Sequence, residues 1–165
     1  MNGCVGTYES WKSLRNRVET LPADRQGAFA LACAQGAAGL NVELLGSLNL
    51  GWEALVGHGD VTQALVDLER DHALDDDAVA ATHYALHSVQ GQAGSAWWAA
   101  SRAMDQAFAG VEYPADAVEF RPVEADALSA VVQSESTRQL RLLQAAESAK
   151  DLTAAVVHLR PNEEA

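Results

Sequence analysis

Apolar residues recur at intervals of three and four positions along nearly the whole chain, and no stretch alternates apolar and polar residues over the length of a strand. This spacing is typical of amphipathic helices. It predicts an all-α fold of six to seven helices, packed as an irregular antiparallel bundle with one long helix near its centre. The expected helices cover residues 8–20, 22–38, 44–57, 60–71, 75–90 and 95–109, and a last one runs from Pro122 to about Lys150 or as far as Leu159.

Breaks in this pattern mark the organisation of the chain. Three consecutive aspartates, residues 75–77, suit the positive end of a helix dipole and therefore a helix start. The one substantial loop is expected between residues 110 and 126, where two prolines interrupt the helical spacing. Residues 1–6 and 161–165 are expected to be loose tails of a single helical domain that spans the whole chain.

The composition is that of a globular protein, with 165 residues of which 48% are hydrophobic and 21% charged. Cys4 lies in the expected N-terminal tail and Cys33 in an apolar helix, so no structural disulfide is expected. The chain shows neither a leader with a cleavage site nor a long uncharged apolar run. These features predict a cytoplasmic protein.

The formal net charge is −12, from 23 acidic and 11 basic residues. This charge repels a phosphate backbone and an anionic membrane surface, so neither nucleic acid nor a membrane is expected as a direct partner. A basic protein would be attracted and steered to its site. Negative charge also serves solubility alone, and the composition does not separate these two interpretations.

Acidic residues crowd into one region around the expected start of the fifth helix, with only Arg70 to offset them. The region lacks the pattern of a calcium loop. It predicts either a solvated surface or a binding face for a basic protein. Small acidic helical proteins that neutralise basic toxins, especially nucleases, use a surface of this kind, which is an analogy of charge and size. The residues of this expected face are Asp67, Glu69, Asp71, Asp75, Asp76 and Asp77.

His83 and His87 lie four residues apart at the border of the apolar face of the fifth expected helix. That spacing could place both imidazoles on one metal ion, but a metal site needs further ligands. The nearest acids along the chain, residues 75–77, lie about two turns away. No glutamate stands between the histidines, so the metalloprotease motif is absent. A hydrogen-bonded histidine pair is therefore expected, with no metal and no cofactor.

Adjacent tryptophans follow on the next expected helix. Trp97 belongs to an apolar stripe and is expected in the core, whereas Trp98 shares a neighbouring stripe with Arg102 and Asp105. Trp98 either lies partly exposed under the Arg102 guanidinium, or it anchors a partner or lines a pocket, in which case Trp98 and Arg102 are both binding residues. A homodimer through either tryptophan is a further alternative.

Glu135 and Gln139 lie one turn apart in the middle of the inward face of the long helix. A buried carboxylate is costly without partners, so Glu135 must meet a cation or several donors, be protonated, or open onto a cavity. These residues are either a satisfied polar clamp between helices or part of a pocket whose acid has a raised pKa. The expected partners of Glu135 are His83, His87, Arg102 and Arg17.

The segment VQSESTRQLRLL, residues 132–143, resembles the last long helix of the YjaG-like proteins, a bacterial all-helical family with no assigned function. The shared pattern is Val-Gln-x-Glu-x-x-x-Gln followed by Leu-Leu. AFALACAQ at residues 28–35 is similar to the family's second helix, and LGWEAL at residues 50–55 to its Trp-x-x-Leu segment. Where the family has an acid followed by an arginine, this chain has Gln35 and Gly36. The resemblance implies an all-α bundle and no particular activity.

Two functions are compatible with these observations. The first is a non-enzymatic binding module that uses the acidic face, with an immunity-type inhibitor of a basic toxin or nuclease as one example. The alternative is a small helical enzyme or small-molecule-binding protein with a pocket around Gln139, in which Glu135, His83 and His87 are the candidate catalytic residues. A binder needs an exposed complementary patch, whereas an enzyme needs a concave site.

Overall fold

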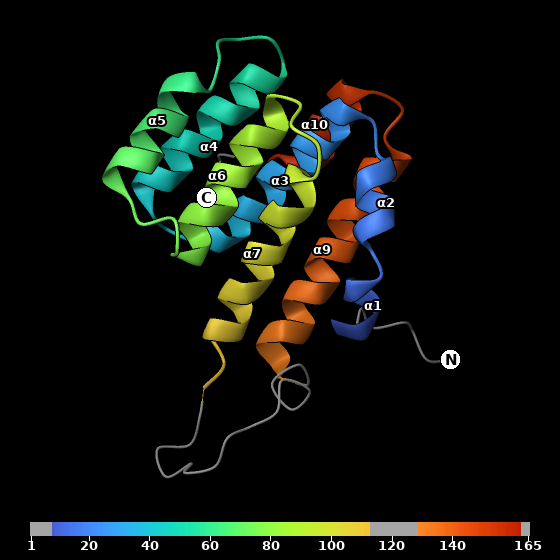
Figure 1. The fold of residues 1–165 in the computed structure, drawn as a ribbon. Helices are drawn as coiled ribbons and strands as arrows, with labels where there is room; N and C mark the ends of the chain where they lie inside the picture. Colours follow the sequence, from blue (N-terminus) through green and yellow to red (C-terminus); the bar gives the residue numbers. More distant parts are fainter. Residues whose placement is uncertain (1–7, 113–128, 163–165) are drawn as a thin grey trace.

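The computed structural model describes residues 8–112 and 129–162, and every regular element among them is an α-helix. The all-α prediction is therefore confirmed for this part of the chain. It contains nine helices instead of six to seven, because the first and last expected helices are each broken in two (Figure 1). The helices are α1 Tyr8–Lys12, α2 Arg15–Thr20, α3 Ala23–Ala38, α4 Val42–Leu55, α5 Thr62–Asp71, α6 Asp77–Val89, α7 Ser95–Ala109, α9 Ala130–Ser148 and α10 Leu152–Leu159.

The centre of the bundle is formed by α3, α6 and α7, which pack against one another (Figure 1). Every residue of α3 from Gly27 to Ala34 is buried. A helix that is apolar all round is enclosed by its neighbours, and its many alanines let the adjacent helices approach closely. The long helix, expected near the centre of the bundle, is α9; it lies beside this core, packed against α3 and α7 and in contact with α1 and α10.

Helices α4 and α5 cover the core on the side of α6 (Figure 1). Gly51 lets α4 approach closely, because a Cβ at this position would lie 2.6 Å from a methyl group of Leu31 and 2.9 Å from one of Leu86. Helix α5 lies at the edge of the bundle and has its main packing against α6. Its buried side chains are Ala64, Leu65 and Leu68.

Helices α1 and α2 replace the single helix expected over residues 8–20. The hydroxyl of Ser13 donates to the carbonyl of Ser10 at 2.6 Å, a local bond that competes with the helical ladder and accompanies the turn between the two helices. The buried indole of Trp11 stacks on that of Trp97, with ring centroids 5.0 Å apart. This contact joins α1 to α7 and confirms that Trp97 belongs to the core.

The long helix does not continue to Leu159. It ends at Ser148, after which Ala149 adopts an extended backbone, and Asp151 caps α10 by accepting a hydrogen bond from the Ala154 N–H at 2.8 Å. The freed carbonyl of Ala149 accepts from the Arg25 guanidinium at 2.6 Å. The break therefore has local causes, a helix-capping aspartate and a cation that binds the helix end.

Several expectations fall on residues that the structure does not describe. These are the N-terminal tail, most of the loop expected between residues 110 and 126, and the start of the long helix after Pro122. Among the helices that it does describe, none combines the length and the apolar character needed to cross a bilayer.

Candidate functional site

Glu135 belongs to a polar cluster that is built mainly by its own helix. The Arg138 guanidinium, one turn further along α9, donates two hydrogen bonds of 2.7 Å to the Glu135 carboxylate. It donates two more of 3.0 Å to the carbonyls of Ala32 and Cys33 in α3. The cation that neutralises Glu135 is thus Arg138, and none of the four expected partners fills that role. The Glu-x-x-Arg spacing was the signal in the sequence that would have identified it.

Gln139 completes this cluster, and its side chain is fully buried. Its amide nitrogen donates to the Ala100 carbonyl at 2.9 Å and to Glu135 at 2.7 Å. Its amide oxygen accepts a hydrogen bond of 2.6 Å from the indole N–H of Trp11. We call Trp11, Glu135, Arg138 and Gln139 the clamp, because these bonds join α9 to α1, α3 and α7. Such a complete set of partners is what a structural polar network requires.

The fit of the clamp against α3 depends on a glycine. A Cβ at Gly36 would clash with the guanidinium carbon and nitrogens of Arg138, so the missing side chain leaves the space that the cation occupies. Cys33, whose carbonyl accepts from Arg138, has a fully buried thiol. Burial raises the pKa of the Cys33 thiol far above its ordinary value, so this thiol stays neutral and inert.

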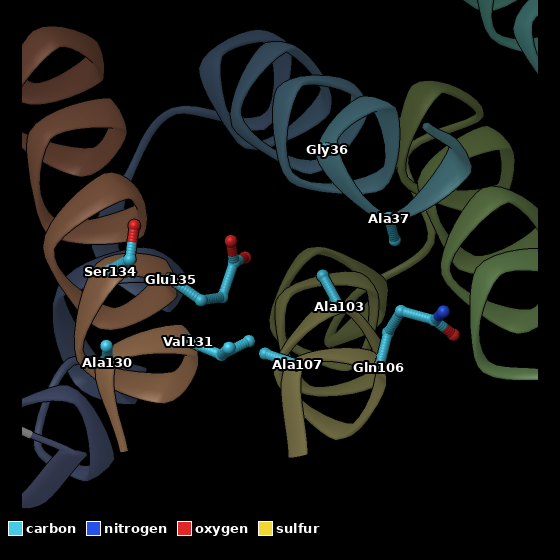
Figure 2. Close-up of a pocket in the computed structure, with 9 residues that line it drawn as sticks. All are labelled: Gly36, Ala37, Ala103, Gln106, Ala107, Ala130, Val131, Ser134 and Glu135. Atoms are coloured by element: carbon cyan, nitrogen blue, oxygen red, sulfur yellow. The ribbon is translucent and has the colours of Figure 1, made fainter. Parts of the chain in front are cut away.

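A cavity of about 650 Å³ lies where α3, α7 and α9 meet (Figure 2). Glu135 lines it together with Ser134, Gln106 and Val131, and the other lining residues are small, namely Gly36 and alanines from all three helices. Figure 2 shows the Glu135 side chain extending from α9 toward α3 and α7. Neither His83 nor the buried Gln139 lines this cavity, so the structure does not assemble the four-residue pocket of the enzymatic alternative.

The two histidines of α6 meet a carboxylate from α5 instead. His83 Nε2 lies 2.9 Å from Glu69 Oε1 and 3.2 Å from His87 Nε2. The two imidazole rings are 4.4 Å apart and nearly perpendicular. The expected histidine pair is therefore present, with a third member that comes from a different helix. No spacing along the chain could have revealed Glu69 as that member, because only the packing of α5 on α6 brings it there.

This cluster differs from the clamp in its exposure to solvent. The side chain of His83 is 15% exposed and that of Glu69 is 52% exposed. Burial and the neighbouring His83 lower the pKa of His87, while Glu69 acts in the opposite direction. His87 is accordingly neutral at pH 7 and presents a nitrogen lone pair for hydrogen bonding or coordination.

The expected acidic face lies along α5 and the start of α6. Arg70 pairs with both Asp67 and Asp71, with nitrogen–oxygen distances of 3.0 and 2.7 Å. Asp76 has a local structural role, since it caps α6 by accepting from the Val79 N–H. Asp75 is exposed.

Two exposed apolar side chains interrupt these carboxylates. Val66 is 48% exposed and Leu74 is 39% exposed. We use the term acidic face for the surface formed by Val66, Asp67, Glu69, Arg70, Asp71, Leu74, Asp75, Asp76 and Asp77.

Arg102 lies at the edge of this face and does not cover Trp98. Its guanidinium pairs with Asp77 at 3.1 Å and with Asp105 at 3.7 Å. The cation over Trp98 is Arg15 of α2, 5.8 Å from the ring. The expected contact between Arg102 and Trp98 is therefore wrong, because the carboxylate at the start of α6 competes successfully for the guanidinium. Trp98 is 47% exposed and stays available as an anchor.

Comparisons of the chain with profiles of protein families, with curated protein sequences and with solved structures give no match. The similarity to the YjaG-like proteins therefore stays a prediction based on the segments that carry it.

Proposed function

We propose that this protein is a non-enzymatic cytoplasmic binding module that docks a basic protein on its acidic face. The observation that supports the proposal most is the mixture of charge and exposed apolar side chains on this face. Val66 and Leu74 stand exposed among the carboxylates. Single exposed apolar residues are common on protein surfaces, but here they stand within a group of carboxylates, and protein interfaces combine apolar contacts with charged surroundings in this way.

The ion pairs of the acidic face leave it strongly negative. Residues 67–77 hold six carboxylates against one arginine, Arg70. Exposed ion pairs contribute only about 0–1 kcal/mol, so the cations of a partner can displace Arg70 at little cost. Like charges grouped on one surface steer an oppositely charged protein and raise its association rate. An immunity-type inhibitor of a basic toxin or nuclease is the example that the size and charge of the chain favour.

The test is capture of partners from a lysate of the source cells at low salt, followed by measurement of the Kd of each retained protein. Reversing the charge at Asp71 and Asp75, each to Lys, should weaken the affinity for the partner by about tenfold or more. The matched control reverses Glu9 and Asp24, each to Lys, which changes the net charge equally outside the face. The control should stay within about twofold of the wild type, since distant exposed charges are screened by salt.

Two results would contradict this proposal. An unchanged Kd in the Asp71→Lys, Asp75→Lys variant would show that the face is not the interface. An equal loss in both variants would show that net charge alone, and not this surface, causes the retention.

The cavity beside the clamp supports a second candidate function, the binding of a small molecule. Its volume of about 650 Å³ suits a ligand of metabolite size, and Glu135, Gln106 and Ser134 offer polar contacts. The large side chain of Ser134→Trp should fill the cavity and abolish any thermal shift that a metabolite library produces. Gln144→Trp, on an exposed part of the same helix, is the control that should retain the shift. A library without any stabilising compound would argue against this candidate.

A further inference from the structure

Three groups that commonly bind metal ions converge where α5 packs on α6. His83 and His87 come from successive turns of α6, and Glu69 comes from α5. One ligand atom from each lies within 4.8 Å of the other two. The spacing of the histidines places both imidazoles on one side of the helix, and the third group arrives from the neighbouring helix.

Hydrogen bonding alone does not satisfy this arrangement. The contact between Glu69 and His83 Nε2 needs a hydrogen on that nitrogen, since an ionised carboxylate only accepts. With that hydrogen in place, His83 Nε2 has no lone pair to offer to His87 Nε2, which lies 3.2 Å away. A hydrogen on His87 Nε2 would then point at another N–H. Glu69 Oε1, His83 Nε2 and His87 Nε2 therefore form two close contacts, but only one hydrogen is available for both of them.

A metal ion satisfies all three atoms together. Two ligands bound about 2.0–2.1 Å from a tetrahedral ion lie about 3.4 Å apart, which follows from the tetrahedral angle. Two of the three separations here, 2.9 Å for Glu69 to His83 and 3.2 Å for His83 to His87, are close to that value, and the third, from Glu69 to His87, is within 4.8 Å. Because Glu69 is half exposed, its side chain can withdraw by the few tenths of an ångström that coordination requires.

We propose that Glu69, His83 and His87 bind one divalent transition-metal ion of the zinc class. Two imidazoles and one carboxylate are the donor types that such ions prefer, whereas magnesium and calcium favour oxygen ligands alone. Three protein ligands leave a coordination position for water, unlike closed structural sites with four. The carboxylates around Glu69 raise the local concentration of cations.

The ion would also fasten α5 to the bundle. This helix has its main packing against α6 and buries only three side chains there. A metal bridge from Glu69 to both histidines would strengthen the link between the two helices, which without metal consists of the 2.9 Å contact between Glu69 and His83. The inference goes beyond the proposed docking of a basic protein, and it does not depend on it.

Untagged protein is first stripped of metal with EDTA and then titrated with ZnCl₂ in a calorimeter. We expect one Zn²⁺ to bind per chain. Glu69→Gln and His87→Gln should each weaken the affinity by at least about tenfold, since the loss of a residue that only hydrogen-bonds to a metal ligand already has an effect of that size. Cobalt should give the visible absorption of a low-coordinate site in the wild type and lose it in both variants. Hydrogen exchange of the α5 amides should slow when Zn²⁺ is added.

Matched controls keep the proposal falsifiable. His58→Gln removes an exposed histidine that also faces a carboxylate, Glu53, at 3.5 Å but has no second imidazole beside it, and it should bind Zn²⁺ like the wild type. MgCl₂ should produce no saturable heat. The absence of saturable Zn²⁺ binding, or binding that is equal in the wild type and in His87→Gln, would overturn the proposal. Circular dichroism verifies that each variant is folded.

Discussion

The clamp and the histidine cluster each contain one glutamate, and the two carboxylates differ in what surrounds them. Glu135 is met by donors, two from Arg138 and one from Gln139, in a site that is mostly shielded from solvent. Glu69 is half exposed and faces a histidine nitrogen that a second imidazole also approaches. Donors satisfy the acid in the clamp, whereas acceptors exceed the available hydrogens in the cluster. The first pattern is that of a structural network, and the second is that of a ligand site.

Removal of the clamp's cation should have the largest effect on stability. Arg138→Met leaves Glu135 without its counter-ion and frees two carbonyls of α3, and we expect a loss of about 3 kcal/mol in the free energy of unfolding. Chemical denaturation monitored by circular dichroism measures it. Arg141→Met, on an exposed position of α9, should cost less than about 0.5 kcal/mol. Similar losses in the two variants would mean that the clamp contributes no more than a surface arginine.

The burial of Cys33, which lies beside the clamp, should make the free energy of unfolding fall at alkaline pH. Burial raises the pKa of the Cys33 thiol in the folded protein, so this thiol stays neutral there. In the unfolded chain the thiol ionises around its ordinary pKa of about 8.5. Its contribution to stability is therefore fully present below pH 8.5 and is lost as the pH rises, by about 2 kcal/mol at pH 10. Cys33→Ala should reduce the fall in unfolding free energy between pH 7 and pH 10 by that amount. An unchanged fall would place the thiol in contact with solvent.

Two helical glycines allow the fit of the clamp to be measured directly. A Cβ at Gly36 displaces the Arg138 guanidinium, whereas a Cβ at Gly46 meets nothing within 4 Å. Gly46→Ala should stabilise the protein by about 0.5–1 kcal/mol through helix propensity. Gly36→Ala should destabilise it by about 1 kcal/mol, because weakened hydrogen bonds of a charged group outweigh the same gain in propensity. The two substitutions should therefore change the free energy of unfolding in opposite directions. A gain in stability in both variants would show that the Arg138 guanidinium moves aside without cost.

The smallest effect is expected at the cluster in the absence of metal. Glu69→Gln changes only a half-exposed contact with His83, so the unfolding free energy of the EDTA-treated protein should change by no more than about 0.5 kcal/mol. With Zn²⁺ present, the wild type alone should gain stability. A large loss without metal would identify Glu69 as a structural residue like Glu135.

The sequence predicted the parts of the fold that depend on local pattern. The helix expected over residues 22–38 corresponds to α3, and the one ending near Ala109 corresponds to α7. The breaks after Lys12 and Ser148 were missed, because an apolar stripe continues across them and the turns depend on single serine and aspartate side chains.

The candidate sites also differ in how far local sequence pattern could predict them. The inward position of Gln139 follows from helical periodicity, and its burial agrees with that pattern. The Glu135–Arg138 pair also follows from spacing on one helix, although the cations predicted to meet Glu135 lie on other helices. The contact of Glu69 with His83 was not accessible, since residues on different helices become neighbours only through packing.

The placement of the four tryptophans gives the protein two optical reporters. Trp11, Trp52 and Trp97 are buried, so their fluorescence follows the integrity of the core, whereas Trp98 is open to aqueous quenchers. Trp98 also lies 6.3 Å from Tyr84, whose ring contacts that of His83. The quenchable part of the fluorescence, which comes from Trp98, therefore reports structural changes at the surface of α6 and α7. The shielded fraction reports unfolding, without any added label.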